Sequence, residues 1–312
     1  MPEDYPRDLL EFERRFATDE ACRQDLFELR WPEGCVGTRG GGRESWATRR
    51  GLWGCCACQY QASVTAGTMF HDTRKAMTLW FRVMWWVTTQ KNGASALGLQ
   101  RELGLKTYRT AWTWLHKLRR AMGRPGRDRI RGRVEVDETY VGGTEVGVSG
   151  RLTHDNALVL VAAKEDGRRT GRIRRRRGTE LTKATVREFV EEAVEAGSVL
   201  RTDGLNVYQG LEGYVHVPVV GKKQVEDAST VLPRVHRVAS LLKRWLLGTQ
   251  QGAVRPEHLD YYLDEFALRF NRRTSAWRGK LFYRLVQQAA QVEPVPYQAI
   301  IKHISPGPEH KG

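Results

Sequence analysis

The sequence predicts an α/β fold with a mixed β-sheet for the larger, C-terminal part of the chain. Two observations lead to this prediction: short runs of strand type alternate with longer runs of helical periodicity, and Gly-containing turns separate several of them. We expect strands at 133–141, 157–163, 171–177, 198–202 and 214–220, and helices at 182–196 and 231–247, with a short helix soon after residue 203.

Each of these elements has a local justification. The first strand ends at the Gly142-Gly143 turn, the second is an apolar run, and the Asp166-Gly167 turn leads into a basic third strand. The first long helix carries its apolar residues on one face, and a glycine separates it from the fourth strand. Three strands, a helix, a strand, a helix, a strand and a helix are the order of a ribonuclease H-like domain with a mixed five-stranded sheet and helices.

The charge of the chain indicates a polyanionic partner. Its 312 residues carry a formal net charge of +15, with a sequence pI near 9.9 and a hydrophobic content of 40%. This content is sufficient for packed cores, and this basic balance favours nucleic acid over a metabolic substrate. The N-terminal residues do not resemble a secretory leader, and the most apolar stretch, 76–89, is too short for a membrane span. We therefore expect a cytoplasmic, DNA-binding protein that does not interact with membranes.

Shifts in composition divide the chain into six expected segments. They are a helical lead-in at 1–30, a zinc-ribbon-like module at 31–67, a helical region with a helix-turn-helix at 68–123, a linker at 124–132, the ribonuclease H-like domain at 133–250, and a C-terminal helical segment and tail at 251–312.

The module at 31–67 has an incomplete set of metal ligands. It is rich in Gly, Cys, Trp and Arg, which is typical of a small module that a metal stabilises. A tetrahedral zinc site needs four ligands, usually from two cysteine pairs, whereas only Cys55 and Cys58 form a CxxC pair here. Two interpretations follow: zinc bound through Cys55 and Cys58, or ordinary thiols.

The helical region contains the outline of a helix-turn-helix. Residues 94–103 and 107–122 have helical patterns, and Gly104 supplies the turn between them. In such a motif the second helix enters the major groove of DNA. The alternative is a helical hairpin that only packs, and the net charge of the chain favours DNA binding. The candidate contacts with DNA are Lys106, Arg109, Thr113 and Lys117.

Two aspartates mark the expected catalytic edge of the sheet. Asp137 lies in or at the end of the first strand and Asp203 follows the fourth, and these two strands are neighbours in the expected sheet. Carboxylates are the usual protein ligands of Mg²⁺, and a two-metal site catalyses in-line displacement at phosphorus. The alternative for Asp203 is a turn or helix cap before Gly204, but the strand order favours a ligand. The adjacent Glu138 has no assigned role.

The long helix offers a third member of the site that is not a carboxylate. No Asp or Glu lies between residues 230 and 255, but His236 and Lys243 are seven residues apart and share a helical face. Imidazole can replace a carboxylate, although it suits Mg²⁺ less well than oxygen does. Glu226 and Asp227 are acidic alternatives in the preceding loop. The other interpretation is a basic helix that clamps the DNA backbone through Arg234, Arg237 and Arg244.

Four separated motifs occur in a compatible order and spacing. They are VEVDETYVGG at 134–143, RTDG at 201–204, VHRVASLLKRWLLGTQQG at 235–252 and YLDEFALRFNRR at 262–273. Together they resemble bacterial insertion-sequence transposases of the DDE class, in the branch with an N-terminal zinc ribbon, a helix-turn-helix and an ISXO2-like catalytic domain. The resemblance implies that Asp137 and Asp203 are metal ligands. It also implies that His236 occupies a third position that varies between Glu, Asn and His, followed by the family's Lys at Lys243.

This resemblance implies an activity, cofactors and partners. The expected function is to cut the ends of an insertion sequence and to join the 3′ hydroxyl to target DNA, with Mg²⁺ or Mn²⁺ and as a homo-oligomer on the terminal repeats. The alternatives are a catalytically inactive relic or repressor that acts through the helix-turn-helix, and a nuclease that cleaves without joining. The zinc ribbon departs from the family, because Gly37 and Gly40 align with its first cysteine pair.

Overall fold

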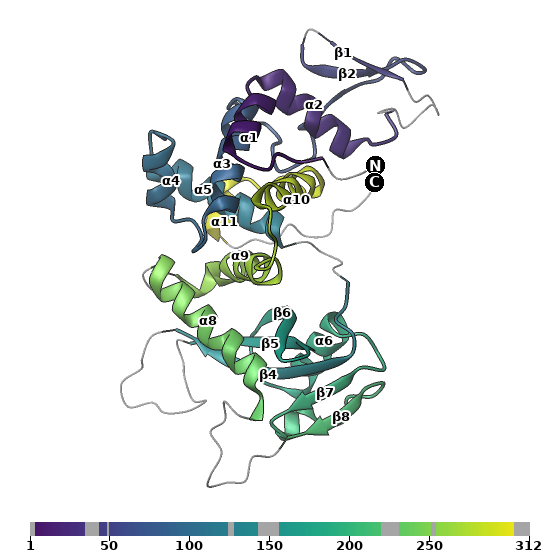
Figure 1. The fold of residues 1–312 in the computed structure, drawn as a ribbon, viewed down its shortest axis with the longest axis vertical. Coiled ribbons are helices and arrows are strands. Elements are labelled where there is room, and N and C mark those ends of the chain that lie inside the picture. The colour runs from purple at the N-terminus through teal and green to yellow at the C-terminus, as the bar shows by residue number, and fades with distance from the viewer. Residues whose placement is uncertain are drawn as a thin grey trace. The chain divides into compact units, whose positions relative to one another are not determined.

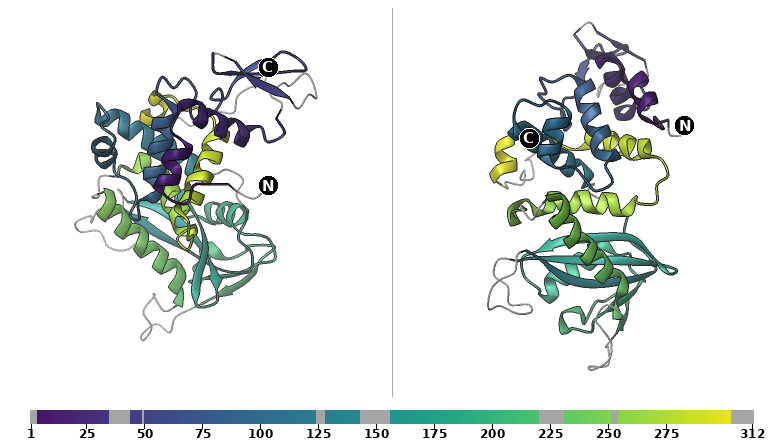
Figure 2. Two further views of the ribbon diagram at one scale, coloured as in Figure 1. Left: turned by 45° about the horizontal axis from the view of Figure 1, so that its top comes forward. Right: turned by 60° about the vertical axis from the view of Figure 1, so that its left-hand side comes forward.

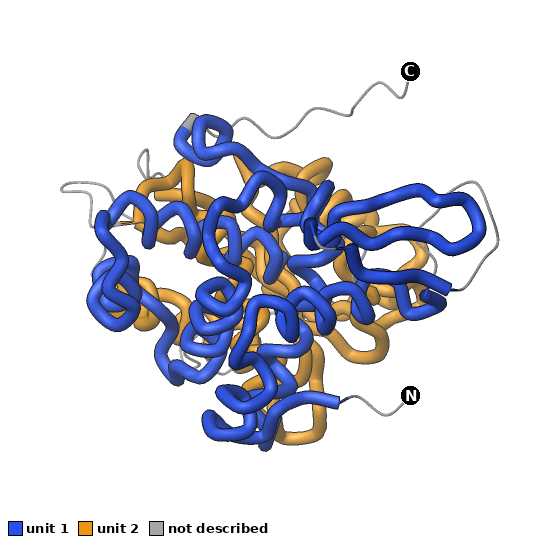
Figure 3. The backbone as a smooth tube through the Cα atoms, turned by 90° about the horizontal axis from the view of Figure 1, so that it is seen from above, with its two compact units in different colours: residues 1–124, 275–312 blue, residues 125–274 orange. Residues whose placement is uncertain are grey.

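The chain forms two compact units (Figure 3). The structure, a computed structural model, describes residues 4–34, 44–48, 50–123, 128–142, 156–219, 231–250 and 254–302. The first unit comprises Met1–Arg124 and Ser275–Gly312, and the second comprises Pro125–Thr274. The first unit therefore combines both ends of the sequence, which differs from the separate C-terminal segment that we expected from residue 251 onwards.

The second unit is built on a five-stranded mixed sheet. Its strands lie in the order β6-β5-β4-β7-β8, so that the first strand of the unit is central. β4 pairs antiparallel with β5 and parallel with β7, and β8 extends the parallel side. This arrangement confirms the predicted α/β architecture and is consistent with a ribonuclease H-like domain. The strands are β4 (Arg133–Val141), β5 (Ala157–Asp166), β6 (Arg169–Gly178), β7 (Val199–Thr202) and β8 (Val215–Pro218).

Helices cover both faces of this sheet (Figures 1 and 2). α6 (Lys183–Ala193) packs on one face, where Phe189 joins Val134 and Leu200 in a core cluster. α8 (Pro233–Gln250) and α9 (Leu259–Asn271) cover the other face over a second cluster that includes Val159 and Val238. The second unit thus extends through α9, beyond the boundary expected at residue 250. Side chains alternate along β4, so that its odd-numbered residues point towards α8.

In its described residues, the first unit packs seven helices and a small sheet. α10 contacts α2, α3 and α5 and supplies Phe282 to an aromatic cluster with Phe12, Phe16 and Phe81. Trp80 is buried and stacks on Trp114, as expected of core residues. The helices are α1 (Leu9–Arg15), α2 (Asp19–Arg30), α3 (Met77–Thr89), α4 (Ala96–Glu102), α5 (Tyr108–Met122), α10 (Arg278–Gln291) and α11 (Tyr297–Lys302), and the antiparallel strands are β1 (Ser45–Ala47), β2 (Leu52–Cys55) and β3 (Gln61–Ser63).

The apolar stretch 76–89, which the sequence showed to be too short for a membrane span, contains the buried helix α3 of 13 residues. In the segments of the chain that the structure describes, no helix combines the length and the hydropathy that crossing a membrane requires.

Candidate active site

Three carboxylates meet where β4 and β7 run side by side. The parallel pairing of these strands aligns Glu135 with Arg201, and the same register two residues further on brings Asp137 opposite Asp203. One carboxylate oxygen from each of Asp137, Glu138 and Asp203 lies within 4.8 Å of those of the other two. Asp137 is buried and the other two are half-buried. The structure therefore brings together the two aspartates of the sequence analysis and adds Glu138.

Glu138 owes its orientation to Tyr208, at the end of the short 3-10 helix η1 (Asn206–Tyr208). The Tyr208 hydroxyl donates a hydrogen bond of 2.6 Å to Glu138 Oε2, and Tyr208 is fully buried. Burial, the negative charge of Glu138 and this hydrogen bond together raise the pKa of Tyr208 far above its ordinary value. Tyr208 therefore stays protonated, and able to donate, above the pH at which an ordinary tyrosine ionises. Sequence reasoning missed this pair, because 70 positions separate its members.

Replacing Tyr208 by phenylalanine is expected to lower stability and to change its dependence on pH. Loss of the donor to a charged acceptor should reduce the free energy of unfolding by about 1–3 kcal/mol at pH 7. Because the folded-state pKa of Tyr208 is raised, its contribution is complete below the unfolded value of about 10 and is lost as the pH rises further. In urea unfolding between pH 7 and pH 11, the free energy of unfolding of the variant should therefore decrease less steeply with pH than that of the wild type.

The exposed Tyr108 provides the matched control for this substitution. Tyr108→Phe should retain the wild-type stability at pH 7 and its alkaline slope. If the free energy of unfolding of Tyr208→Phe has the same pH dependence as that of the wild type, the raised pKa assigned to Tyr208 is contradicted.

His236 lies beside the carboxylates, in the first turn of α8. Its Nε2 atom is 3.7 Å from Asp137 Oδ2, and its side chain is 34% exposed. This distance exceeds that of a hydrogen bond, and His236 is not a member of the group formed by the three carboxylates. The carboxylate oxygens suit Mg²⁺ or Mn²⁺, and one imidazole nitrogen is compatible with Mn²⁺ in particular. Lys243 lies two turns further along α8, with its side chain exposed.

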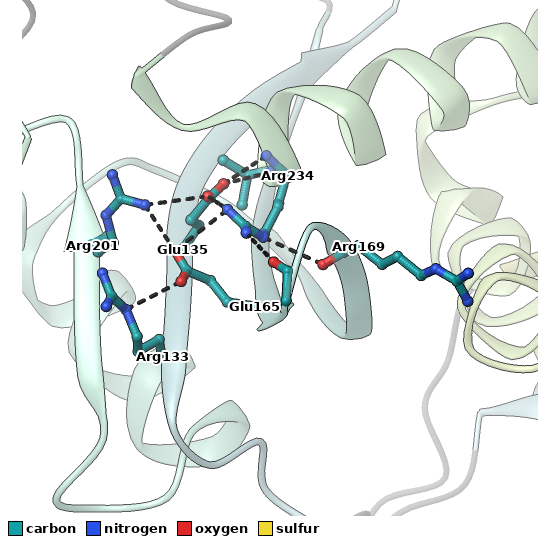
Figure 4. Close-up of polar contacts among 8 residues, drawn as sticks. Arg133, Glu135, Glu165, Arg169, Arg201 and Arg234 are labelled. Atoms are coloured by element: carbon teal, nitrogen blue, oxygen red, sulfur yellow. Dashed lines mark hydrogen bonds and ion pairs between the residues drawn. The ribbon is translucent and has the colours of Figure 1, made fainter.

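Arg234, which we expected to contact the DNA backbone, is engaged within the unit instead (Figure 4). Its Nη1 atom lies 2.9 Å from Glu135 Oε1 and 3.4 Å from Glu165 Oε1, and its Nη2 atom donates to the Gly167 carbonyl at 2.8 Å. Only 16% of its side chain is exposed. Both ends of its guanidinium are thus bonded within the unit, and a contact of Arg234 with DNA stays a prediction. Arg237 and Arg244 are exposed on the same helix.

The predicted helix-turn-helix corresponds to α4 and α5, whose connection contains Gly104 at a φ of 59°. The candidate side chains differ in their surroundings. Lys106 and Arg109 are exposed, and the Arg109 guanidinium lies over the Tyr297 ring at 4.3 Å. The Thr113 hydroxyl donates to the Arg109 carbonyl, and burial lowers the pKa of the half-buried Lys117. DNA binding by this hairpin stays a prediction.

Two further polar side chains of α5, those of His116 and Arg119, are buried, and Arg119 donates to the Ala94 carbonyl at 3.1 Å. They therefore do not belong to the exposed basic face of α5.

The predicted zinc ligands lie at one end of the small antiparallel sheet. Cys55 is buried at the end of β2, and Cys58 is half-buried in the turn that follows. Among the residues that the structure describes, no group of three or more metal-ligating side chains includes a cysteine. Zinc binding by Cys55 and Cys58 stays a prediction. The sequence positions Cys35, Gly37, Gly40, Glu226 and Asp227 lie outside the described residues.

Comparison with known proteins identifies one part of the chain. Residues 129–271 match the family model of the ISXO2-like transposase domain. This segment includes the five-stranded sheet, α8 and α9, and therefore the carboxylate cluster and His236. Searches of curated proteins and of solved structures found no match to the chain.

Proposed function

Through residues 129–271 the chain belongs to the insertion-sequence transposases of the DDE class, and we propose that it cuts element ends and joins the freed 3′ hydroxyl to target DNA. The observation that carries this proposal is the convergence of Asp137, Glu138 and Asp203 beside the central strand β4 and the end of β7, with His236 3.7 Å from Asp137. Both steps are in-line displacements at phosphorus, and a cluster of this kind is suited to them.

We assign metal binding to Asp137, Asp203 and His236. Glu138 adds a fourth ligand-type side chain, whose Oε2 atom accepts the Tyr208 hydroxyl. When bound, Mg²⁺ or Mn²⁺ would activate the attacking oxygen and neutralise charge at the scissile phosphate. The chain's own contribution is to hold these donors on two neighbouring strands and one helix, so that little reorganisation accompanies the reaction.

The DNA contacts are proposed from exposed basic side chains. Lys243, Arg237 and Arg244 lie on the helix that carries His236, and we assign them to phosphates near the reacting bond. Binding of the terminal repeats is assigned to the α4–α5 hairpin through Lys106 and Arg109. Because transposition brings two element ends together, we propose that the active form is a homo-oligomer on DNA.

Metal removal tests the proposed activity. Labelled DNA from both sides of the gene serves as the element ends, and a supercoiled plasmid serves as the target. We expect joined products in Mg²⁺ or Mn²⁺ and none in EDTA, because the phosphoryl transfer depends on the carboxylate-bound ions. A gel assay of strand transfer measures the joined products with metal and with EDTA.

Two other outcomes would replace the proposal. Salt-sensitive binding of the ends with no nicking in either metal would indicate a DNA-binding protein without catalysis. Nicking without joining would indicate a nuclease on the same fold.

A further inference from the structure

An ion network of glutamates and arginines joins β4, β5, β7 and α8, the last of which carries His236 (Figure 4). It is formed by glutamates of β4 and β5 and by arginines of β4, β7 and α8. In a strand, residues two positions apart point to the same face. Three network residues each precede one member of the proposed site by two positions: Glu135 precedes Asp137, Arg201 precedes Asp203, and Arg234 precedes His236.

The charges of this network are closely paired. Glu135 is fully buried, and its Oε1 atom lies 2.9 Å from Arg234 Nη1 and 3.8 Å from Arg201 Nη1. Glu165 Oε1 lies 2.8 Å from Arg201 Nη1 and 3.4 Å from Arg234 Nη1, and Glu165 Oε2 lies 3.1 Å from Arg133 Nε. Burial opposes ionisation of Glu165, but these arginines hold its pKa below the ordinary value. Both arginines that precede site residues therefore share the same two carboxylates.

Glu135 also binds the first turn of α8. Its Oε2 atom accepts hydrogen bonds from the backbone N–H groups of Arg234, at 2.7 Å, and Val235, at 3.1 Å. The first N–H groups of a helix have no partner within the helix, and a carboxylate there also complements the helix dipole. Here the cap comes from a strand nearly 100 positions earlier in the sequence. It attaches the start of α8 to β4, one residue before His236.

We propose that Glu135 is a positioning residue for the transposase site. Its carboxylate fixes the start of α8 to β4 and so holds His236 beside Asp137. The inference rests on the proposed function. Residues that support metal ligands typically affect metal affinity or activity about 10- to 100-fold when they are replaced.

Two variants that each shorten one carboxylate by one methylene distinguish the positioning role of Glu135 from a contribution to the ion network alone. Glu135→Asp keeps the charge but withdraws the carboxylate from the two N–H groups of α8. Glu165→Asp is the matched control, because Glu165 contacts arginine side chains of the same network and no backbone N–H group of α8. Both variants retain the net charge of the protein.

Three measurements on the full-length variants test the proposal. In Glu135→Asp we expect the single-turnover rate of strand transfer at saturating DNA to fall about 10- to 100-fold, with the affinity for the ends nearly unchanged. Titration with Mn²⁺ should show an affinity about tenfold weaker than that of the wild type. The amides of Arg234 and Val235 should exchange with solvent about tenfold faster. Glu165→Asp should remain within about threefold of the wild type in all three measurements, because it retains the cap of α8.

The outcomes separate this inference from the proposed function. Equal effects in the two variants would overturn the positioning role and leave only a structural ion network. A wild-type rate and Mn²⁺ affinity in Glu135→Asp, despite rapid amide exchange, would overturn it as well. If the wild-type chain joins no DNA, the proposed activity fails, whereas the Mn²⁺ titration and the amide exchange still decide whether Glu135 positions the site. If Glu135→Asp does not fold, Glu135→Gln replaces it, because it removes the charge of the residue that caps α8. Mn²⁺ affinity and the protection of the Val235 amide should then fall together, and lost protection with an unchanged affinity would overturn the role.

Discussion

Replacing Asp137 by asparagine is expected to abolish strand transfer while DNA binding persists. Asp137 is the buried member of the carboxylate cluster, and it is also the neighbour of His236. Without its charge the site loses a metal ligand, and the loss of several kcal/mol of stabilisation at the phosphate should lower the rate at least about a thousandfold. Strand transfer with labelled ends measures the rate, and a filter-binding titration measures the affinity for the ends.

Two companion variants complete this experiment. Asp203→Asn removes the opposite carboxylate and should have a similarly large effect. Glu212→Gln removes an exposed acidic charge from the segment that precedes β8, at the other end of the parallel strands. It should therefore keep the wild-type rate. Strand transfer by Asp137→Asn at the wild-type rate would refute the assignment of the site.

Replacing His236 by alanine is expected to lower strand transfer about a hundredfold, whereas replacement by glutamate should restore activity in Mg²⁺. The imidazole is 3.7 Å from Asp137, and its loss removes the metal ligand that we propose for α8. Nitrogen ligands suit Mn²⁺ better than Mg²⁺, and carboxylates suit both. The ratio of the rates in Mn²⁺ and Mg²⁺ should therefore be higher for the wild type than for His236→Glu. A decrease of about a hundredfold in the rate is typical when one group of a catalytic site is misplaced or lost.

The exposed Ser240 lies one turn further along α8 and provides a control on the same helix. Ser240→Ala should match the wild type in both metals. If His236→Ala retains the wild-type rate and the wild-type affinity for Mn²⁺, His236 is not a ligand, and the site consists of the carboxylates alone.

Several features of the fold were predictable from local sequence patterns. The first strand was expected at 133–141, where the structure has β4, and the other four strands lie within a few residues of their expected positions. The pairing of the first strand with the fourth was expected from the order of elements of a ribonuclease H-like domain, and the sheet has this pairing. For this reason the sequence placed Asp137 and Asp203 on neighbouring strands.

Other features depended on packing that no local pattern encodes. His116 and Arg119 occupy positions on α5 that look polar in the sequence, but both are buried within the first unit. Arg234 looked like a DNA contact because it belongs to a basic helix, yet two glutamates from different strands neutralise it. We expected the residues after 250 to form one C-terminal helical segment. In the structure α9 packs on the sheet of the second unit, whereas α10 packs in the first unit.

The sequence by itself determined the α/β class, the order of the strands and the pair of aspartates, because these follow from periodicity and from the direction of consecutive strands. Only the tertiary structure decided the role of Glu138, the hydrogen bond from Tyr208 and the cap that Glu135 places on α8. These contacts join residues 70 to 100 positions apart. They depend on how the helices dock on the sheet, and this docking arises from the packing of the whole core. No periodic pattern in the sequence predicts it.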